Sequence, residues 1–160
     1  MRFVALALAL TAVPALALAA DCPSPAYPEA KPFGSVESGR ASVDTALMAA
    51  IAADKRVILV FGANWCHDSR ALAGWFATPR FQTMLHDRYE IAWINVGDKP
   101  GEKDRNGDLA RRFGLGPITG TPTVLVLDST GKPVNLADAP TWRNAASRSG
   151  DAIFAYFAKR

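Results

Sequence analysis

An unbroken apolar run, Val57-Ile58-Leu59-Val60-Phe61, constrains the fold of this chain more than any other feature. Consecutive apolar residues rich in β-branched side chains are typical of a strand that is buried on both faces. Such a strand needs a covering layer on each side, because neither of its faces can meet water. The run therefore predicts an α/β domain with a central sheet between layers of helices.

Patterns on either side of this run supply the remaining elements. Before it, Ser42 can cap a helix whose apolar residues recur at helical spacing. After it, Asp128-Ser129-Thr130-Gly131 is a hairpin turn signal. We predict helices over residues 43–53, 66–76, 108–113 and 145–158, a short helix after Pro79, and strands over residues 57–61, 90–96, 123–127 and 133–136. This order predicts a mixed central sheet with helices on both faces.

The first twenty residues have the composition of a secretory signal. Arg2 precedes the almost wholly apolar stretch 3–18, and Ala19-Ala20 forms a small-residue exit. A membrane span needs about 20 apolar residues, and Pro14 together with the small-residue exit favours cleavage over anchoring. We therefore expect residues 1–20 to be a signal peptide that is removed. The mature protein is expected to be exported to a bacterial periplasm, without a stable membrane anchor.

The segment that follows is rich in proline. Residues 21–40 contain four prolines, Pro23, Pro25, Pro28 and Pro32. Proline removes a backbone donor and fixes φ, so this spacing disfavours both a helix and an inner strand. We expect residues 21–40 to form an extended arm, and residues 41–160 to form the folded domain.

Charge and composition exclude several classes of function. The formal net charge of +3 includes Arg2, which leaves with the signal, and the remaining basic residues are scattered among acidic ones. No basic patch of the kind that binds nucleic acid is present in the sequence. The two cysteines and two histidines lack the short spacing of a metal site. We predict no metal, no cofactor and no nucleic-acid partner.

Cys66 is the residue that suggests chemistry. It stands where the buried strand turns into a helix, so its sulfur should face the unpaired N–H groups of the first turn, which favour the thiolate. His67 adds positive charge when protonated, and the hydroxyl of Ser69 should lie near the sulfur and donate a hydrogen bond to it. A lone cysteine is commonly a buried structural residue. The neighbouring Trp65 and the polar residues after Cys66 favour a partly exposed, reactive one.

A second feature is the sequence Gly120-Thr121-Pro122-Thr123, directly before an apolar strand. Proline at this point has no ladder donor and belongs to a strand start or a cis bend. Together with the residues Phe61 to Ser69, which contain the Trp-Cys motif, this sequence resembles the thioredoxin superfamily. The resemblance extends over residues 42–160 and implies a thioredoxin-like three-layer fold.

The resemblance also implies roles for particular residues. Cys66 would be the nucleophile, and the loop of Thr121 and Pro122 would face it and hold an extended substrate segment, with Trp65 beside it. The chain departs from the family pattern in one respect above all. The family motif is usually Cys-x-x-Cys, whereas Ser69 occupies the second position here. A disulfide cycle within the motif is therefore unavailable.

A second departure concerns proton transfer. Family members often carry a buried acid six residues before the nucleophile, where this chain has Val60. Asp68 is an exposed substitute in one interpretation. In the favoured interpretation its charge complements the positive end of the helix dipole.

These residues predict a monothiol exchange protein, a thiol-disulfide oxidoreductase or isomerase that lacks the second motif cysteine. Cys66 would form mixed disulfides with protein or low-molecular-weight thiols and disulfides, in isomerisation, reduction or deglutathionylation. Cys22 is a candidate resolving thiol, while a disulfide that staples the fold or joins two molecules is equally open. The alternative is a non-catalytic module that uses the same groove to bind extended peptides or a partner protein.

Overall fold

The computed structural model describes residues 27–160, so the expected signal peptide and Cys22 lie outside the described part of the chain. Within it, the elements are η1 (Val36–Ser38), α1 (Gly39–Ala53), β1 (Arg56–Gly62), α2 (His67–Phe76), α3 (Pro79–Arg88), β2 (Tyr89–Asn95), α4 (Gly107–Arg112), β3 (Thr123–Leu127), η2 (Ala139–Ser147) and α5 (Gly150–Ala158), where η denotes a 3-10 helix. In these residues no helix combines the length and apolar character that crossing a membrane requires.

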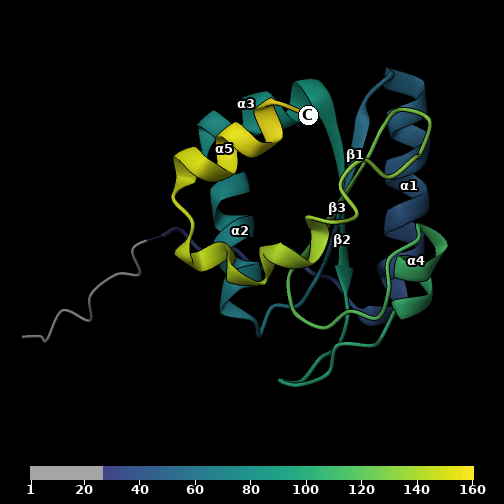
Figure 1. Ribbon diagram of the computed structural model, residues 1–160, viewed down its shortest axis with the longest axis vertical. Helices are drawn as coiled ribbons and strands as arrows, with labels where there is room; N and C mark the ends of the chain where they lie inside the picture. The colour runs from purple at the N-terminus through teal and green to yellow at the C-terminus, as the bar shows by residue number, and fades with distance from the viewer. Residues whose placement is uncertain (1–26) are drawn as a thin grey trace, which may run out of the picture.

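The sheet has the order β2-β1-β3, with β1 in the centre. Strand β1 pairs in parallel with β2, so that Gly62 lies opposite Asn95. It pairs antiparallel with β3, so that Phe61 lies opposite Thr123. Helices α1 and α4 cover one face of the sheet, and α2, α3 and α5 cover the other (Figure 1). The expected mixed sheet with helices on both faces is confirmed.

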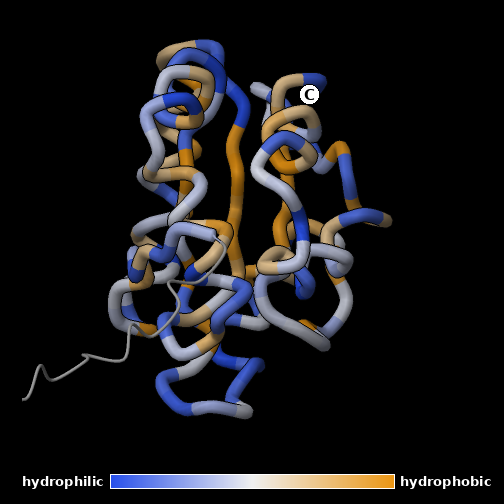
Figure 2. The backbone as a smooth tube through the Cα atoms, turned by 90° about the vertical axis from the view of Figure 1, so that its left-hand side faces the viewer, coloured by the Kyte–Doolittle hydropathy of each residue, from blue (hydrophilic) through white to orange (hydrophobic). Residues whose placement is uncertain are grey.

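Alternation along β1 divides the core into two clusters. Val57, Leu59 and Phe61 pack with α1 and α4, whereas Ile58 and Val60 pack with the opposite layer. Figure 2 shows the hydrophobic strands running through the centre of the more polar envelope. The second cluster is rich in aromatic rings, which come from Phe33, Phe76, Phe81, Tyr89, Trp142 and Phe157. Burial on both faces is the reason that the run carries no polar residue.

Helix α1 begins earlier than predicted. It starts at Gly39, so Ser42 lies inside the helix and the predicted boundary between residues 40 and 41 falls within it. The turn of η1 leads directly into α1, which extends the helix backwards. Gly39 is suited to this start because a Cβ there would lie 2.6 Å from Nδ2 of Asn106. That amide donates to the carbonyl of Val36 at 2.7 Å and fixes the approach to the helix.

The predicted last helix is two helices. The chain breaks between η2 and α5, where Arg148 and Ser149 adopt extended backbone angles. Ser149 caps α5, since its hydroxyl oxygen accepts a hydrogen bond from the N–H of Ala152 at 3.2 Å. The prediction of one continuous helix over residues 145–158 was therefore wrong.

The predicted strand over residues 133–136 is reduced to a single bridge between Leu127 and Pro133. The main-chain bonds of this bridge run from the N–H of Asp128 to the carbonyl of Lys132 and from the N–H of Val134 to the carbonyl of Val126, each at 2.9 Å. Beyond them the side chain of Asn135 takes the place of main-chain pairing along β3. Its Oδ1 accepts from the N–H of Val126 at 2.7 Å, and its Nδ2 donates to the carbonyl of Val124 at 3.0 Å.

Candidate functional site

Cys66 is the N-cap residue of helix α2. Its N–H donates to the carbonyl of Ala63 at 3.1 Å, and its own carbonyl accepts the N–H of Arg70 at 3.0 Å, which closes the first turn of the helix. Among residues 27–160, no side chain caps the first N–H groups of α2. Strand β1 and the short turn after it therefore place the sulfur at the positive end of the helix dipole.

The loop before β3 covers this sulfur. The thiol of Cys66 donates to the carbonyl oxygen of Thr121, with 3.2 Å between Sγ and oxygen. The peptide bond between Thr121 and Pro122 is cis, and both of these residues are buried. Because the loop lies over it, Cys66 is only 8% exposed. The expectation of a partly exposed cysteine was wrong.

His67 and Asp68 form a pair beside the sulfur. The side chain of His67 is 65% exposed, and its Nε2 lies 3.0 Å from Oδ2 of Asp68. The other carboxylate oxygen of Asp68 accepts the N–H of Ala146 at 2.8 Å. Asp68 is 8% exposed rather than exposed as expected, because η2 packs over it. Its carboxylate joins the start of α2 to the end of η2.

Ser69 does not make the hydrogen bond predicted for it. The residue is fully buried, and its Oγ has no partner among residues 27–160. The hydroxyl faces β1, since a Cβ on Gly62 would lie 2.6 Å from Oγ of Ser69. The sulfur of Cys66 is turned instead toward the loop of Thr121.

Trp65 lies in the turn before Cys66, and Val60 lies in strand β1. Trp65 is partly buried, and its Nε1 donates to the carbonyl of Gly97 at 2.8 Å. This bond ties the turn before Cys66 to the chain that follows β2. Val60 is fully buried, so the position of the family's acid is occupied by an apolar side chain.

Arg70 is a site residue that the sequence did not reveal. Its Nη1 donates to the carbonyls of Asn64 and Trp65, at 3.2 and 3.0 Å, in the turn that carries Cys66. Its Nε and Nη2 bind the two carboxylate oxygens of Glu29 at 3.1 and 3.2 Å. A bidentate pair of this kind fixes the guanidinium plane. Arg70 therefore braces the turn that carries Cys66.

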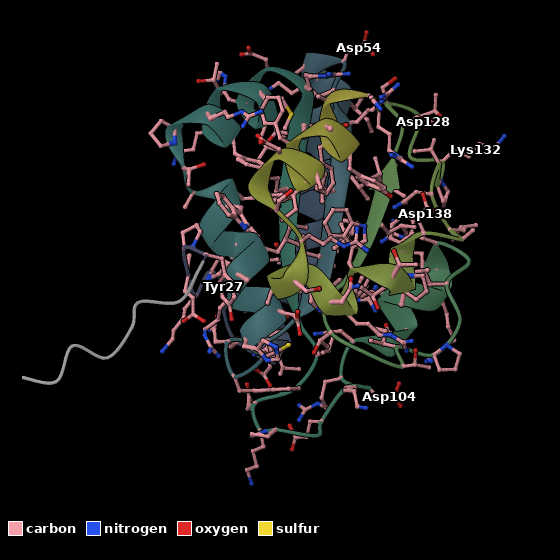
Figure 3. All side chains as sticks on the ribbon, turned by 60° about the vertical axis from the view of Figure 1, so that its left-hand side comes forward. Tyr27, Asp54, Asp104, Asp128, Lys132 and Asp138 are labelled. Atoms are coloured by element: carbon pink, nitrogen blue, oxygen red, sulfur yellow. The ribbon has the colours of Figure 1, made fainter. Side chains whose placement is uncertain are left out.

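Glu29, the partner of Arg70, belongs to the proline-rich arm. The described part of this arm has no helix or strand before η1, yet it packs against the domain. The side-chain amide of Asn64 donates to the carbonyl of Phe33 at 2.7 Å and accepts its N–H at 3.2 Å. The ring of Phe33 is buried and meets Trp93 edge-on, with 5.3 Å between ring centroids. Figure 3 shows the start of this segment, at Tyr27, beside α2.

A thiol at a helix N-terminus, under a loop that ends in a cis-proline and leads into the next strand, is the arrangement expected from the sequence resemblance. The comparison with known families supports it, since residues 39–129 match the family described as Thioredoxin-like. The chain belongs to the thioredoxin-like family.

Solved structures similar to this thioredoxin-like protein include those of two proteins. The crystal structure of a disulphide isomerase from Xylella fastidiosa Temecula1 is similar at a TM-score of 0.71 and 32% identity, covering 81% of this chain and 96% of the other. The solution structure of a thioredoxin from Thermus thermophilus is similar at a TM-score of 0.50 and 21% identity, covering 72% and 81% of the two chains. The second similarity concerns the fold alone. None of the curated proteins searched matches the chain.

The described residues of this thioredoxin-like protein place one thiol at the site. Cys66 is the only cysteine among residues 27–160, and the buried hydroxyl of Ser69 stands where the family motif has its second sulfur. The site can attack a disulfide or hold a mixed disulfide. It cannot close a disulfide within the motif.

Proposed function

We propose that the chain carries out thiol-disulfide exchange through a single thiol, Cys66, in the cell envelope. The placement of Cys66 at the N-terminus of α2, where no side chain of residues 27–160 caps the first N–H groups, carries this proposal. Membership of the thioredoxin-like family and the similarity to a disulphide isomerase support thiol-disulfide oxidoreductase chemistry in general.

The proposed step is a substitution at sulfur. The Cys66 thiolate attacks one sulfur of a disulfide, a new S–S bond forms to Cys66, and the old S–S bond breaks. The leaving half departs as a thiolate and takes a proton from solvent. The Cys66 sulfur is oxidised and the leaving sulfur is reduced, so no other oxidant or reductant is needed. A second thiol must then attack the mixed disulfide and release Cys66.

In this proposal, main-chain groups bind the proton of the Cys66 thiol and stabilise the negative charge of its thiolate. In the thiol form, Cys66 donates its proton in a hydrogen bond to the Thr121 carbonyl. After ionisation the sulfur has no proton to donate, and the free N–H groups at the start of α2 stabilise the negative charge. His67, when protonated, adds positive charge nearby, while Asp68 holds its ring in place. Trp65 and Pro122 would border the bound substrate segment.

The proposed partners are protein or low-molecular-weight thiols and disulfides. Ser69 cannot resolve a mixed disulfide, so the resolving thiol comes from another molecule or from Cys22. Export to a periplasm, by means of residues 1–20, would provide the compartment in which disulfides persist. Mapping the disulfides of the purified mature protein tests the role of Cys22, since two free thiols would exclude both an internal bond and a staple.

A kinetic comparison tests the proposed function. The mature protein is mixed with 2,2′-dithiodipyridine, a neutral disulfide whose leaving thiol absorbs light. The Cys22→Ser variant should release the leaving thiol rapidly, whereas Cys66→Ser should release it only at the rate of its remaining thiol. Equal rates in the two variants would contradict a special role for Cys66. Full retention of partner binding by Cys66→Ala, without any exchange, would favour the non-catalytic module.

A further inference from the structure

Arg143 lies beside the loop that covers Cys66. A Cβ placed on Gly120 would be 3.0 Å from Cδ and 3.1 Å from Cβ of Arg143, so the aliphatic part of this arginine crosses the backbone of Gly120. Gly120 directly precedes Thr121, whose carbonyl accepts the Cys66 thiol. The absence of a side chain at Gly120 therefore allows Arg143 to approach the loop closely.

The charge of Arg143 is unmatched. The residue is exposed, and among residues 27–160 its guanidinium has no ion pair and no hydrogen bond within the usual distances. Arg148, on the same part of the chain, is engaged by contrast. It donates to the carbonyl of Thr141 at 2.8 Å and lies 4.3 Å above the ring of Trp142.

Asp68, the acid that binds η2, does not neutralise Arg143. Asp68 is buried, and its two oxygens are occupied by the N–H of Ala146 and the ring of His67. Arg143 and Ala146 both belong to η2, although Asn144 between them has non-helical backbone angles. An exposed arginine, unpaired among residues 27–160, therefore stands beside the loop that covers the Cys66 sulfur.

We propose that Arg143 selects disulfides that carry a carboxylate close to the sulfur attacked by Cys66. This inference rests on the exchange function proposed above. A guanidinium binds a carboxylate through two parallel hydrogen bonds. The carboxylate can belong to an acidic side chain next to the cystine of a protein, or to a small peptide disulfide such as that of glutathione, and the chemistry of recognition is shared.

Arg143 takes no part in the bond changes. Cys66 forms the new S–S bond, the substrate S–S bond breaks, and the leaving thiolate takes its proton from solvent, as in the general step. An extended chain advances about 3.3–3.6 Å per residue, so a carboxylate adjacent to the half-cystine stays close to the attacked sulfur. Arg143 is accordingly a specificity residue.

The test compares two peptide disulfides that differ by one charge in each half. The homodisulfides of acetyl-Glu-Cys-Ala-amide and acetyl-Gln-Cys-Ala-amide react with the mature protein in a Cys22→Ser background. We expect the Glu peptide to react about two- to five-fold faster, as suits one exposed ion pair. Arg143→Gln should bring the ratio near one, and Arg143→Lys should retain part of it. Salt should weaken the preference, because the screening length is about 8 Å at 0.15 M ionic strength.

A matched control removes the same charge elsewhere. Arg56 begins β1, whereas Cys66 follows its other end, and a strand of this length separates the two ends by roughly 20 Å. Arg56→Gln should keep the wild-type ratio. Glutathione disulfide forms a third arm. If Arg143→Gln slows only the reaction with glutathione disulfide, the proposal is supported and the carboxylate comes from a small peptide. If Arg143→Gln removes a preference for the Glu peptide, the proposal is supported and the carboxylate comes from a protein segment.

Two results would overturn the inference alone. The first is a wild-type protein that reacts equally fast with the Glu and Gln peptides and reacts no faster with glutathione disulfide than Arg143→Gln does. The second is a preference for the Glu peptide that survives in Arg143→Gln. A failure of every disulfide to react with Cys66 is a different outcome. It would overturn the exchange function and, with it, the preference that rests on it.

Discussion

The sulfur of Cys66 and the main-chain carbonyl of Thr121 meet at 3.2 Å, although the two residues are 55 positions apart in the chain. The thiol proton is thus held by the backbone of a loop and not by a side chain. The position of that loop decides how the sulfur is covered, because Cys66 is otherwise at an open helix end. Contacts that brace the loop and the turn before α2 are therefore the contacts to test.

Thr123 braces the loop from its far end. Its hydroxyl donates to the carbonyl of Gly120 at 2.9 Å, and the residue is buried. Thr123→Val keeps the shape but leaves that carbonyl without this partner, so we expect a loss of about 1 kcal/mol in the free energy of unfolding. Urea denaturation measures it. Thr83→Val removes an exposed hydroxyl that bonds Pro79 and serves as the control, and an equal loss there would contradict the role of Thr123.

Arg70 should position the turn that carries Cys66. Arg70→Met removes the bonds to the carbonyls of Asn64 and Trp65 as well as the Glu29 pair. Hydrogen bonds from charged groups contribute roughly 1.5–3 kcal/mol, so we expect a loss of this size in stability and slower reaction of Cys66 with a neutral disulfide. Glu29→Gln leaves the bonds to the carbonyls and should have the smaller effect on the rate.

A surface pair provides the control for Arg70. Arg40 bonds the exposed Asp108 on α4, and Arg40→Met should cost at most about 1 kcal/mol without changing the rate of Cys66. If Arg70→Met altered stability but left the rate and its pH profile unchanged, Arg70 would have a structural role only. Partial rescue of the rate by Arg70→Lys would support positioning through the carbonyls.

Asp68 should stabilise the junction between α2 and η2. Asp68→Ala leaves the N–H of Ala146 without its acceptor. An orphaned buried donor costs about 1–3 kcal/mol, so for this part-buried N–H we expect a loss at the lower end of that range. Asp68→Asn retains an acceptor for that N–H and should lose less. Thermal unfolding compares them with Asp44→Ala, which removes only an exposed partner of Arg112. The junction would lack the proposed importance if all three variants unfolded alike.

Tyr89 makes stability depend on alkaline pH. Its hydroxyl donates to the carbonyls of Phe157 and Arg160, each at 2.8 Å, and burial raises the pKa of Tyr89 above its usual value of 10.0. The folded state then holds this proton more tightly than the unfolded state. Its contribution is complete below about pH 10 and is lost as the pH rises through the higher folded pKa.

Tyr89→Phe tests this dependence by urea denaturation at several pH values. The variant should lose about 1 kcal/mol at neutral pH and show a weaker decline than the wild type above pH 10. Tyr27→Phe changes the number of tyrosines at the start of the described segment and should retain the wild-type decline. An unchanged decline in Tyr89→Phe would assign the alkaline instability to other groups.

Local patterns in the sequence were sufficient for the central part of the fold. The buried strand and the helix after Cys66 follow from short apolar runs and from a residue that can end one element and begin the next. The mixed sheet followed from their order. The helix break at Ser149 was missed, although residues 147–151, Ser-Arg-Ser-Gly-Asp, contain no hydrophobic residue and Ser149 can cap a helix that starts at Gly150.

Contacts between distant residues could not be predicted in this way. The side chain of Asn135 takes the place of main-chain pairing by binding main-chain groups of β3, and nothing in the sequence around Asn135 indicates these partners. Arg70 and Glu29 are 41 residues apart, and nothing in either neighbourhood indicates the partner. The burial of Asp68 likewise depends on how η2 packs across α2.

The central claim is that Cys66 exchanges disulfides as a single thiol. The most direct measurement is peptide mapping by mass spectrometry of the mature Cys22→Ser variant after reaction with an excess of a neutral disulfide. We predict one mixed disulfide, on Cys66, that persists until an external thiol is added and that is absent from a variant that also carries Cys66→Ser. An unmodified Cys66 in the folded protein would contradict the claim.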